Sequence, residues 1–265
     1  MPDAAELFHK GRLAEAIEAQ LAVVRSKPTD QPSRLFLFEL LGFAGELERA
    51  SRQVDSLTLD DPDLHLAAGN YRNCLKAEEA RRKILGGEKP RFFMDPGPST
   101  VLRLEAFEAL ARGDNEAFRS KLEEANSTEP VLKGTINGKP FELIRDADDL
   151  FAGVLEVFAQ GNYYWIPLDQ VASMATNPVK SPRDLLWMPA NLAMVDGATG
   201  PVFLPVLYLG SHAHGLETVK LGRERDWMPV VPDAAALLRG FGPKVYLAGD
   251  DEVNLTDVRE LTITA

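Results

Sequence analysis

The chain has 265 residues, 45% of them hydrophobic and 26% charged, and its formal net charge is −11 at pH 7. This composition is typical of a globular protein with a sizeable core, and the negative charge disfavours nucleic-acid binding because phosphate backbones would be repelled. The single cysteine, Cys74, cannot form an internal disulfide, which favours a reducing compartment. The N-terminal residues lack the pattern of a signal peptide, and no apolar run approaches the ~20 residues of a membrane helix. We therefore expect a cytoplasmic protein without membrane insertion.

Residues 1–130 are predicted to form repeated pairs of helices. Gly11 and Gly45 are 34 residues apart, and so are Ala16 and Ala50. Glycine allows a tight turn between two helices, and the alanine five residues later allows the second helix to approach its neighbour closely. The period matches that of tetratricopeptide (TPR) helical hairpins. The sequence therefore predicts a TPR-like array of α-hairpins, and an irregular helical bundle is the alternative.

Further helices are expected along the same half. Apolar residues recur at helical spacing in Ser33–Ala44, Asp63–Leu85 and Val101–Ala111. Ser99 is expected to cap the last of these helices. A weaker third copy of the repeat begins at Gly113, with Phe118 in place of the alanine.

Two local clusters in this half have more than one interpretation. The basic residues Arg81–Lys83 follow Glu78 and Glu79 directly, which favours a solvated helix face over a nucleic-acid site. The apolar residues Phe92–Met94 lie inside a segment rich in glycine and proline that is expected to be an irregular loop. They are expected to pack against the other domain, or alternatively to form a docking surface.

Residues 131–265 are predicted to form a mostly β domain with one short helix. Asn137-Gly138 indicates a hairpin turn within Val131–Glu142. Helical spacing returns over Asp148–Phe158, and Asp148 and Asp149 suit the first turn of such a helix. Short apolar runs then alternate with turn residues: Tyr163–Pro167, Leu185–Met194, Val202–Leu209, Met228–Val231, Val245–Leu247 and Val258–Thr264. Such spacing favours a small barrel or twisted sheet, so the chain is expected to be an α+β protein of two domains, 1–130 and 131–265.

The sequence contains none of the common phosphate-binding or nucleophile motifs. The best candidate for chemistry is His212 and His214, which lie two residues apart between glycines. Two such histidines chelate a metal only if a third ligand exists, and Glu217 or Asp226 is a candidate. A solvated loop is the simpler interpretation, so we expect no metal and no cofactor. Cys74 has no flanking pattern of an activated nucleophile and is expected to pack in the core.

A set of phrases in the second half resembles the ImpE/SciE family, also called TagJ. They are Tyr164–Leu168, Pro182–Ala190, Phe203–Ser211 and Leu221–Trp227. The resemblance extends over nearly the whole chain, although Met188, Leu209 and Arg225 depart from the family phrases. It implies a cytoplasmic, non-enzymatic adaptor of the bacterial type VI secretion system. It further implies binding to a helix near the N-terminus of the sheath small subunit and a link to the AAA+ ATPase that recycles the sheath.

Within these phrases, seven residues are candidates for partner binding: Arg183, Asp184, Trp187, Tyr208, Arg223, Asp226 and Trp227. Two interpretations remain open. The arginines pair with carboxylates and the tryptophans fill the junction between helices and sheet, or some of these residues form a pocket for a partner helix, because Trp, Tyr and Arg dominate binding hot spots.

Three functions follow as hypotheses. The leading one is the adaptor, which docks an amphipathic helix in an apolar groove and whose acidic surface favours a partner segment with Lys or Arg. The second is a metal-dependent hydrolase centred on His212 and His214. The third is a scaffold that associates with itself through its helical array.

Overall fold

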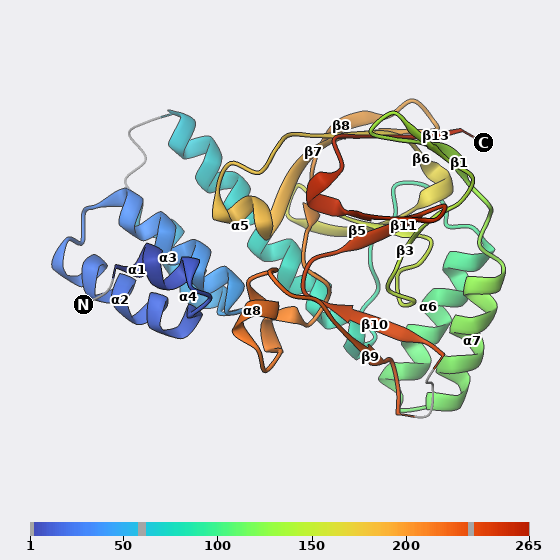
Figure 1. Ribbon diagram of the computed structural model, residues 1–265, viewed down its shortest axis with the longest axis horizontal. Coiled ribbons are helices and arrows are strands. Elements are labelled where there is room, and N and C mark those ends of the chain that lie inside the picture. The colour runs from blue at the N-terminus through green and yellow to red at the C-terminus, as the bar shows by residue number, and fades with distance from the viewer. Residues whose placement is uncertain (1–2, 58–61, 233–235, 265) are drawn as a thin grey trace.

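The structure is a computed structural model that describes residues 3–57, 62–232 and 236–264. It is an α+β protein in which seven helices precede a mostly β region (Figure 1). The helices are α1 (Ala4–His9), α2 (Leu13–Ser26), α3 (Gln31–Phe43), α4 (Leu47–Asp55), α5 (Pro62–Lys83), α6 (Pro98–Ala111), α7 (Asn115–Ser127) and α8 (Glu217–Lys220). Short 3-10 turns include η3 (Pro182–Leu185), η4 (Ser211–Ala213) and η5 (Leu255–Asp257).

In the described ranges the strands form three sheets. They are β1 (Lys133–Ile136), β2 (Lys139–Phe141), β3 (Ile144–Asp146), β4 (Val154–Ala159), β5 (Asn162–Pro167), β6 (Val171–Thr176), β7 (Trp187–Met194), β8 (Thr199–Pro205), β9 (Asp226–Pro229), β10 (Leu238–Phe241), β11 (Val245–Ala248), β12 (Asp251–Asn254) and β13 (Glu260–Thr264). The largest sheet has the order β2-β1-β13-β6-β7-β8-β4-β5, and smaller sheets are β12-β11-β3 and β10-β9. Among the described residues its outer strands β2 and β5 do not pair with each other, so the sheet is twisted and open and the expected barrel is not closed.

The glycines of the repeat form equivalent turns. Gly11, Gly45 and Gly113 have positive φ angles of 78°, 76° and 75° and separate the helices of the pairs α1–α2, α3–α4 and α6–α7. In each turn the glycine N–H donates to the carbonyl three residues earlier, and the next N–H donates to the carbonyl five residues before it. This is the Schellman arrangement, which favours glycine. Ala16 and Ala50 are fully buried, as their role in close helix packing requires.

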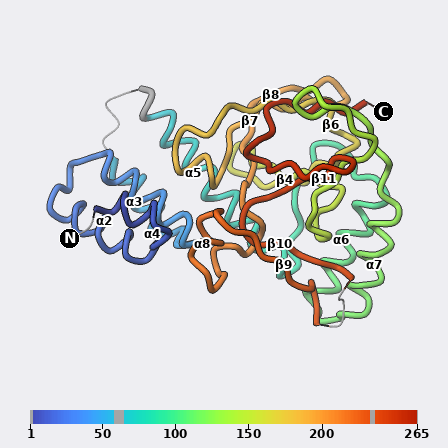
Figure 2. The backbone as a smooth tube through the Cα atoms, viewed as in Figure 1, coloured from blue at the N-terminus to red at the C-terminus, as the bar shows by residue number. Residues whose placement is uncertain are grey.

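The three pairs do not stack into one TPR-like array. Helices α1–α4 pack in sequence at one end of the molecule, whereas α6 and α7 pack with each other at the opposite end (Figures 1 and 2). The 22-residue helix α5 runs between these ends and packs against β4 and β5 as well as against α4. The continuous array is therefore not confirmed, because the sheet takes the place of a partner helix beside α5.

Two local predictions were wrong. The segment 148–158 is not a helix: residues 148–153 form turns and β4 follows from Val154. All residues of β4 except the last are buried, and a strand covered on both faces has a continuous apolar run that periodicity cannot distinguish from a helix. Ser99 is not a cap, because α6 begins at Pro98 with Gly97 at the N-cap, and Ser99 is buried in the first turn.

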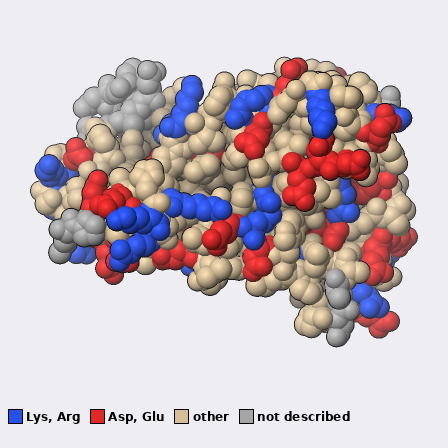
Figure 3. All heavy atoms as spheres, viewed as in Figure 1, with Lys and Arg blue, Asp and Glu red and all other residues tan. Residues whose placement is uncertain are grey.

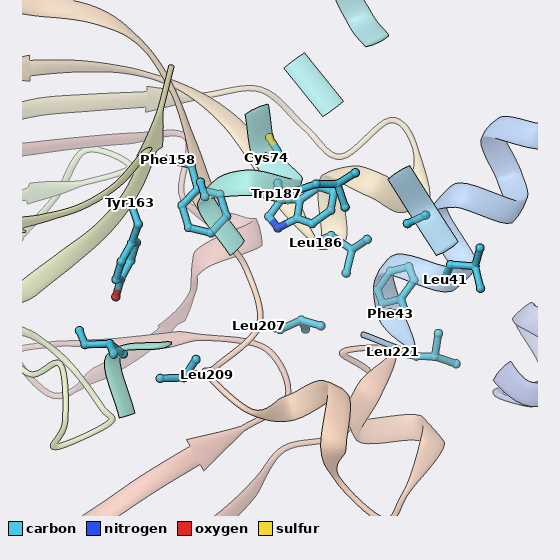
Figure 4. Close-up of a cluster of buried hydrophobic side chains, with 14 of the residues drawn as sticks. Leu41, Phe43, Cys74, Phe158, Tyr163, Leu186, Trp187, Leu207, Leu209 and Leu221 are labelled. Atoms are coloured by element: carbon cyan, nitrogen blue, oxygen red, sulfur yellow. The ribbon is translucent and has the colours of Figure 1, made fainter. Parts of the chain in front are cut away.

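The hairpin around Asn137-Gly138 forms as predicted, with β1 and β2 on either side of the turn. The described helices include none that is both long and apolar enough to cross a bilayer. One hydrophobic cluster runs from α1 to α7 and continues to Trp187, Leu207 and Leu221 in the second half (Figure 4). This cluster crosses residue 130, where the sequence changes from helices to strands.

Candidate functional site: a groove between the long helix and the sheet

A groove of about 770 Å³ lies between α5 and the strands β4, β5, β7 and β8. On the helix it is lined by Leu66, Asn70, Asn73 and Cys74, which share one face because they are three and four residues apart. On the sheet it is lined by Phe158, Ala159, Gln160, Gly161, Tyr164, Pro189, Ala190, Asn191, Leu192, Met194, Asp196, Ala198, Thr199, Gly200, Pro201, Val202 and Phe203, with Phe93 and Asn177 from neighbouring loops.

The chemistry of this groove suits a protein segment with an apolar face. Asp196 is the one charged residue in its lining among the described residues, and the remainder are apolar residues, amides, the thiol of Cys74 and the hydroxyl groups of Tyr164 and Thr199. Leu66 is 67% exposed and Phe93 is 50% exposed, so the groove carries two of the large apolar side chains that the fold leaves open to solvent. Apolar surface concentrated at a concave site marks interaction sites. Cys74 is buried in the helix wall, and burial raises the pKa of its thiol, which agrees with its predicted packing role.

Two prolines explain why the sheet opens at this groove. Strands β7 and β8 exchange hydrogen bonds at even-numbered residues, since Met194 N–H donates to Ala198 and Val206 N–H donates to the carbonyl at 186. Residues 199, 201, 203 and 205 therefore turn their backbone groups toward β4. Pro201 and Pro205 have no N–H, and only the pair Phe158 and Phe203 joins β4 to β8. A partner strand placed along β8 would also find no N–H donor at Pro201 and Pro205. This edge of β8 is therefore poorly suited to strand addition.

The loop before α6 covers the outer edge of the sheet next to the groove. Arg91 N–H donates to the Tyr163 carbonyl and Trp165 N–H donates to the Arg91 carbonyl, both at 3.0 Å. Phe93 stacks on Tyr164 with ring centroids 4.1 Å apart. Phe92 packs against the hydrophobic cluster of Figure 4 and Met94 against that of the sheet. Phe92 and Met94 thus pack against the hydrophobic clusters as expected, while half-exposed Phe93 also lines the groove.

A buried ionic network fixes the other end of α5. The Arg81 side chain donates to both carboxylate oxygens of Glu156 at 2.7 and 2.8 Å and to the Leu207 carbonyl at 3.0 Å. Lys244 Nζ lies 2.6 Å from Glu156 and 3.3 Å from Asp146. Burial raises the pKa of Glu156, but Arg81 and Lys244 outweigh it and lower the pKa to about 2. The prediction that Arg81 lies on a solvated face was wrong, because Glu156 on β4 supplies a charge partner that its own helix does not reveal.

The seven predicted residues lie in three places, and none of them lines the groove. Arg183 stacks 5.0 Å over the Tyr71 ring of α5 and donates a hydrogen bond to the Tyr71 hydroxyl. Asp184 accepts the N–H groups of Lys180 and Ser181, at 2.8 and 3.1 Å, and so caps η3. Trp187 is buried against Phe38 of α3, at the junction of helices and sheet that Figure 4 shows.

A second group surrounds β9. The Tyr208 hydroxyl is buried and donates to Asp146 at 2.9 Å, and its ring lies 5.6 Å from that of Trp227. Asp226 accepts the N–H of Trp227 and contacts His214 at 3.1 Å. Burial raises the pKa of Tyr208, so its hydroxyl stays protonated and acts as a donor.

Arg223 forms the third place by itself. It donates to the carbonyls of Phe8 and His9 at the end of α1. The first interpretation expected it to pair with a carboxylate instead. Arg183 has a carboxylate near it, Asp184, at 3.8 Å, but its principal partner is Tyr71.

The histidines do not form a metal site in the described part of the chain. His214 accepts the Leu216 N–H at Nδ1, so Nε2 carries the proton that faces Asp226. Both ring nitrogens are therefore in use. Burial lowers the pKa of His212 to about 4, and its ring packs on Gly45. The described residues contain no group of three or more His, Cys, Asp or Glu that would hold a metal. The His214 side chain is 8% exposed, so it does not lie in solvent as expected from the flanking glycines.

Comparison with known proteins gives the family. A family model described as "ImpE protein" matches residues 138–262. A Pseudomonas aeruginosa protein described as "Type VI secretion system accessory component TagJ" is 31% identical over 259 residues, which cover 97% of this chain and 90% of that protein. The chain belongs to the ImpE (TagJ) family.

A solved structure has the same fold over nearly the whole chain. The crystal structure of VPA1032 from Vibrio parahaemolyticus matches it with a TM-score of 0.89 at 23% identity, over 99% of this chain and 97% of that chain. At that identity the likeness shows the fold alone.

The groove was not found from the sequence. Its helix wall at Leu66, Asn70 and Asn73 reads as an ordinary polar face of a helix, because the sheet that completes it comes more than 80 residues later. Pro201 and Pro205 were the available signal, since prolines four residues apart in a strand lie on the same edge and leave that edge without N–H donors.

Proposed function

We propose that this chain is a non-enzymatic, cytoplasmic adaptor of a type VI secretion system that holds a helix of the sheath small subunit in the groove beside α5. Membership of the family whose relative is described as a type VI accessory component supports the system. The groove is the single observation that carries the proposed mode of binding.

The groove fits a helix better than an extended strand. Its helix wall and the outer side of β7 and β8 form two walls of a trough, and the prolines of β8 deny a strand its hydrogen-bond donors. A helix satisfies its own backbone groups and needs only an apolar face. With a net charge of −11 and Asp196 in the lining, the expected partner helix carries Lys or Arg beside its apolar face.

On the view in Figure 3, Lys and Arg side chains lie among Asp and Glu and do not form one continuous basic band. Mixed charge on this face supports a protein partner in the proposal.

The proposal is tested by copurification of the sheath small subunit with full-length chain. Leu66→Asp places a charge in the exposed helix wall of the groove, where it meets the apolar face of the partner, and should abolish copurification while the thermal melt stays unchanged. Val131→Asp is the matched control, because Val131 is 70% exposed and lies outside the groove. Equal recovery with both variants would contradict the groove as the site.

The link to the AAA+ ATPase is tested in the same preparation. The ATPase should be recovered with the wild-type chain and the sheath subunit together. Recovery of neither protein, with both expressed, would leave the family fold without the proposed partners.

A further inference from the structure

One carboxylate from the second half caps the first helical pair. Glu217, on α8, accepts the backbone N–H groups of Leu13 and Ala14, both at 2.9 Å. These two residues begin α2, and the residue at its N-cap, Arg12, makes no side-chain cap. A carboxylate at a helix N-terminus satisfies donors that the helix leaves free and is favoured by the helix dipole. Glu217 therefore supplies from 204 residues away the cap that α2 lacks locally.

An arginine from the same segment holds the other side of the same turn. Arg223 donates to the carbonyls of Phe8 and His9, the latter at 2.6 Å, and these residues end α1. A cation at a helix C-terminus is the counterpart of the anion at an N-terminus. Between the two contacts, a Cβ on Gly11 would lie 3.4 Å from Thr218, so the turn itself rests on the segment.

The second helical pair is held by the same segment. The ring of His212 packs so closely on Gly45 that a Cβ there would lie 2.4 Å from it. Arg82 of α5 donates to the Gly45 carbonyl at 2.7 Å. Figure 4 shows Leu221 near Phe43 of α3 in the same region. The segment from 210 to 225, which we call the turn clamp, thus contacts the turns of both pairs.

The helices that the turn clamp holds form the back of the groove's helix wall. Phe38 of α3 stacks on Tyr71 of α5, with ring centroids 5.1 Å apart. Asp55 of α4 accepts a hydrogen bond from Arg72 of α5 at 2.8 Å. The next residues on α5 line the groove, among them Cys74. A displacement of α3 and α4 therefore moves this wall.

We propose that Glu217 and Arg223 are positioning residues that fix α1–α4 and thereby maintain the observed width of the groove. Release of the turn clamp widens the groove. Any effect of the turn clamp on partner binding rests on the proposed function. The mechanical coupling between the turn clamp and the groove does not depend on the proposed function.

The single cysteine of the chain reports the coupling directly. Cys74 is 2% exposed and lies in the helix wall of the groove, so its rate of alkylation by iodoacetamide measures how often the wall opens. In the full-length chain, Glu217→Gln and Arg223→Gln should each raise that rate about tenfold, in the range expected for loss of a helix cap. Amide exchange at Leu13 and Ala14 should accelerate in Glu217→Gln, which verifies that the cap is lost.

Three further variants separate coupling from loss of overall stability. Glu15→Gln removes the same charge from the first turn of α2, but Glu15 pairs with Arg12 and not with the clamp, so Cys74 should react as in wild type. Leu122→Ala opens a cavity in α7 and serves as a variant of reduced stability with an intact clamp. Arg223→Lys keeps the cation, so Cys74 in this variant should be alkylated at close to the wild-type rate.

Any of three results would overturn the coupling. If amide exchange at Leu13 and Ala14 rises while Cys74 reacts at the wild-type rate, the clamp does not control the groove. If Cys74 reacts faster only in proportion to lost stability, as in Leu122→Ala, the role is merely structural. If neither quantity changes in Glu217→Gln, the carboxylate does not hold α2. A faster Cys74 reaction in a chain that binds no sheath subunit would sustain the coupling and reject the proposed function.

Discussion

Single residues carry much of the difference between the sequence and the structure. The run Arg81–Lys83 contains three adjacent cations with different surroundings: Arg81 is 2% exposed in the ionic network, Arg82 reaches the Gly45 carbonyl, and Lys83 is half exposed beside Glu79. Helix geometry turns adjacent residues to different faces. Which face meets the sheet is decided by Glu156 and Lys244, far along the chain, so the sequence around Arg81 could not reveal it.

Arg81→Met should destabilise the fold by about 3–5 kcal/mol, because it leaves Glu156 buried with one of its two cationic partners. Lys83→Met, two residues later, should change the free energy of unfolding by less than about 0.5 kcal/mol. Urea denaturation of both variants measures the difference. Equal effects would show that the network is not formed in solution.

Glu39 gives the fold a pH dependence of predictable sign. Burial raises the pKa of Glu39 from 4.5 to about 7, although Arg183 acts in the opposite direction. Its carboxyl is easier to ionise when unfolded, so its contribution to stability is complete below pH 4.5 and is lost as the pH rises to about 7. Glu39→Gln has no ionisable carboxyl at this position, so its stability does not fall for this reason as the pH rises. The stability of the variant relative to wild type should therefore increase by about 3 kcal/mol between pH 4.5 and pH 8, as measured by denaturation at the two pH values. A constant difference would contradict the burial of this carboxyl.

At the scale of elements, turn chemistry was predictable and strand burial was not. Gly11, Gly45 and Gly113 marked three helix turns correctly, because a left-handed residue is needed locally whatever the surroundings. The helix predicted over Asp148–Phe158 failed because the apolar spacing of β4 reflects cover on both faces of the sheet, which is a tertiary property. The groove also belongs to this scale, since it arises where two prolines of β8 leave the seam with β4 nearly unpaired.

Two of the turn glycines differ in what surrounds them, and this gives a matched pair of variants. Gly113→Ala meets no atom within 4 Å and should cost about 1–2 kcal/mol from its positive φ angle alone. Gly45→Ala has the same angle but places its Cβ 2.4 Å from His212, so it should cost a further ~1–3 kcal/mol. Thermal or chemical denaturation compares the two. Equal losses would show that His212 does not pack on this turn.

At the scale of the whole molecule, the helical pairs and the sheet share one hydrophobic cluster, and the groove lies between α5 and the sheet. The family and the α+β class were predictable from phrases and periodicity. The position of the groove was not, because Leu66 and Pro201 become neighbours only in the folded chain. The seven candidate residues have intramolecular partners in three places, and two of them, Arg183 and Trp187, contact α5 and α3.

The central claim is that a sheath helix occupies the groove, and amide exchange on the bound complex tests it most directly. A synthetic peptide of the first helix of the sheath small subunit is titrated into the full-length chain, with a scrambled peptide of equal charge as control. The account predicts saturable binding with new protection concentrated in residues 66–74 and 199–203. Binding with protection confined to residues 208–227, or no binding at high micromolar peptide, would contradict it.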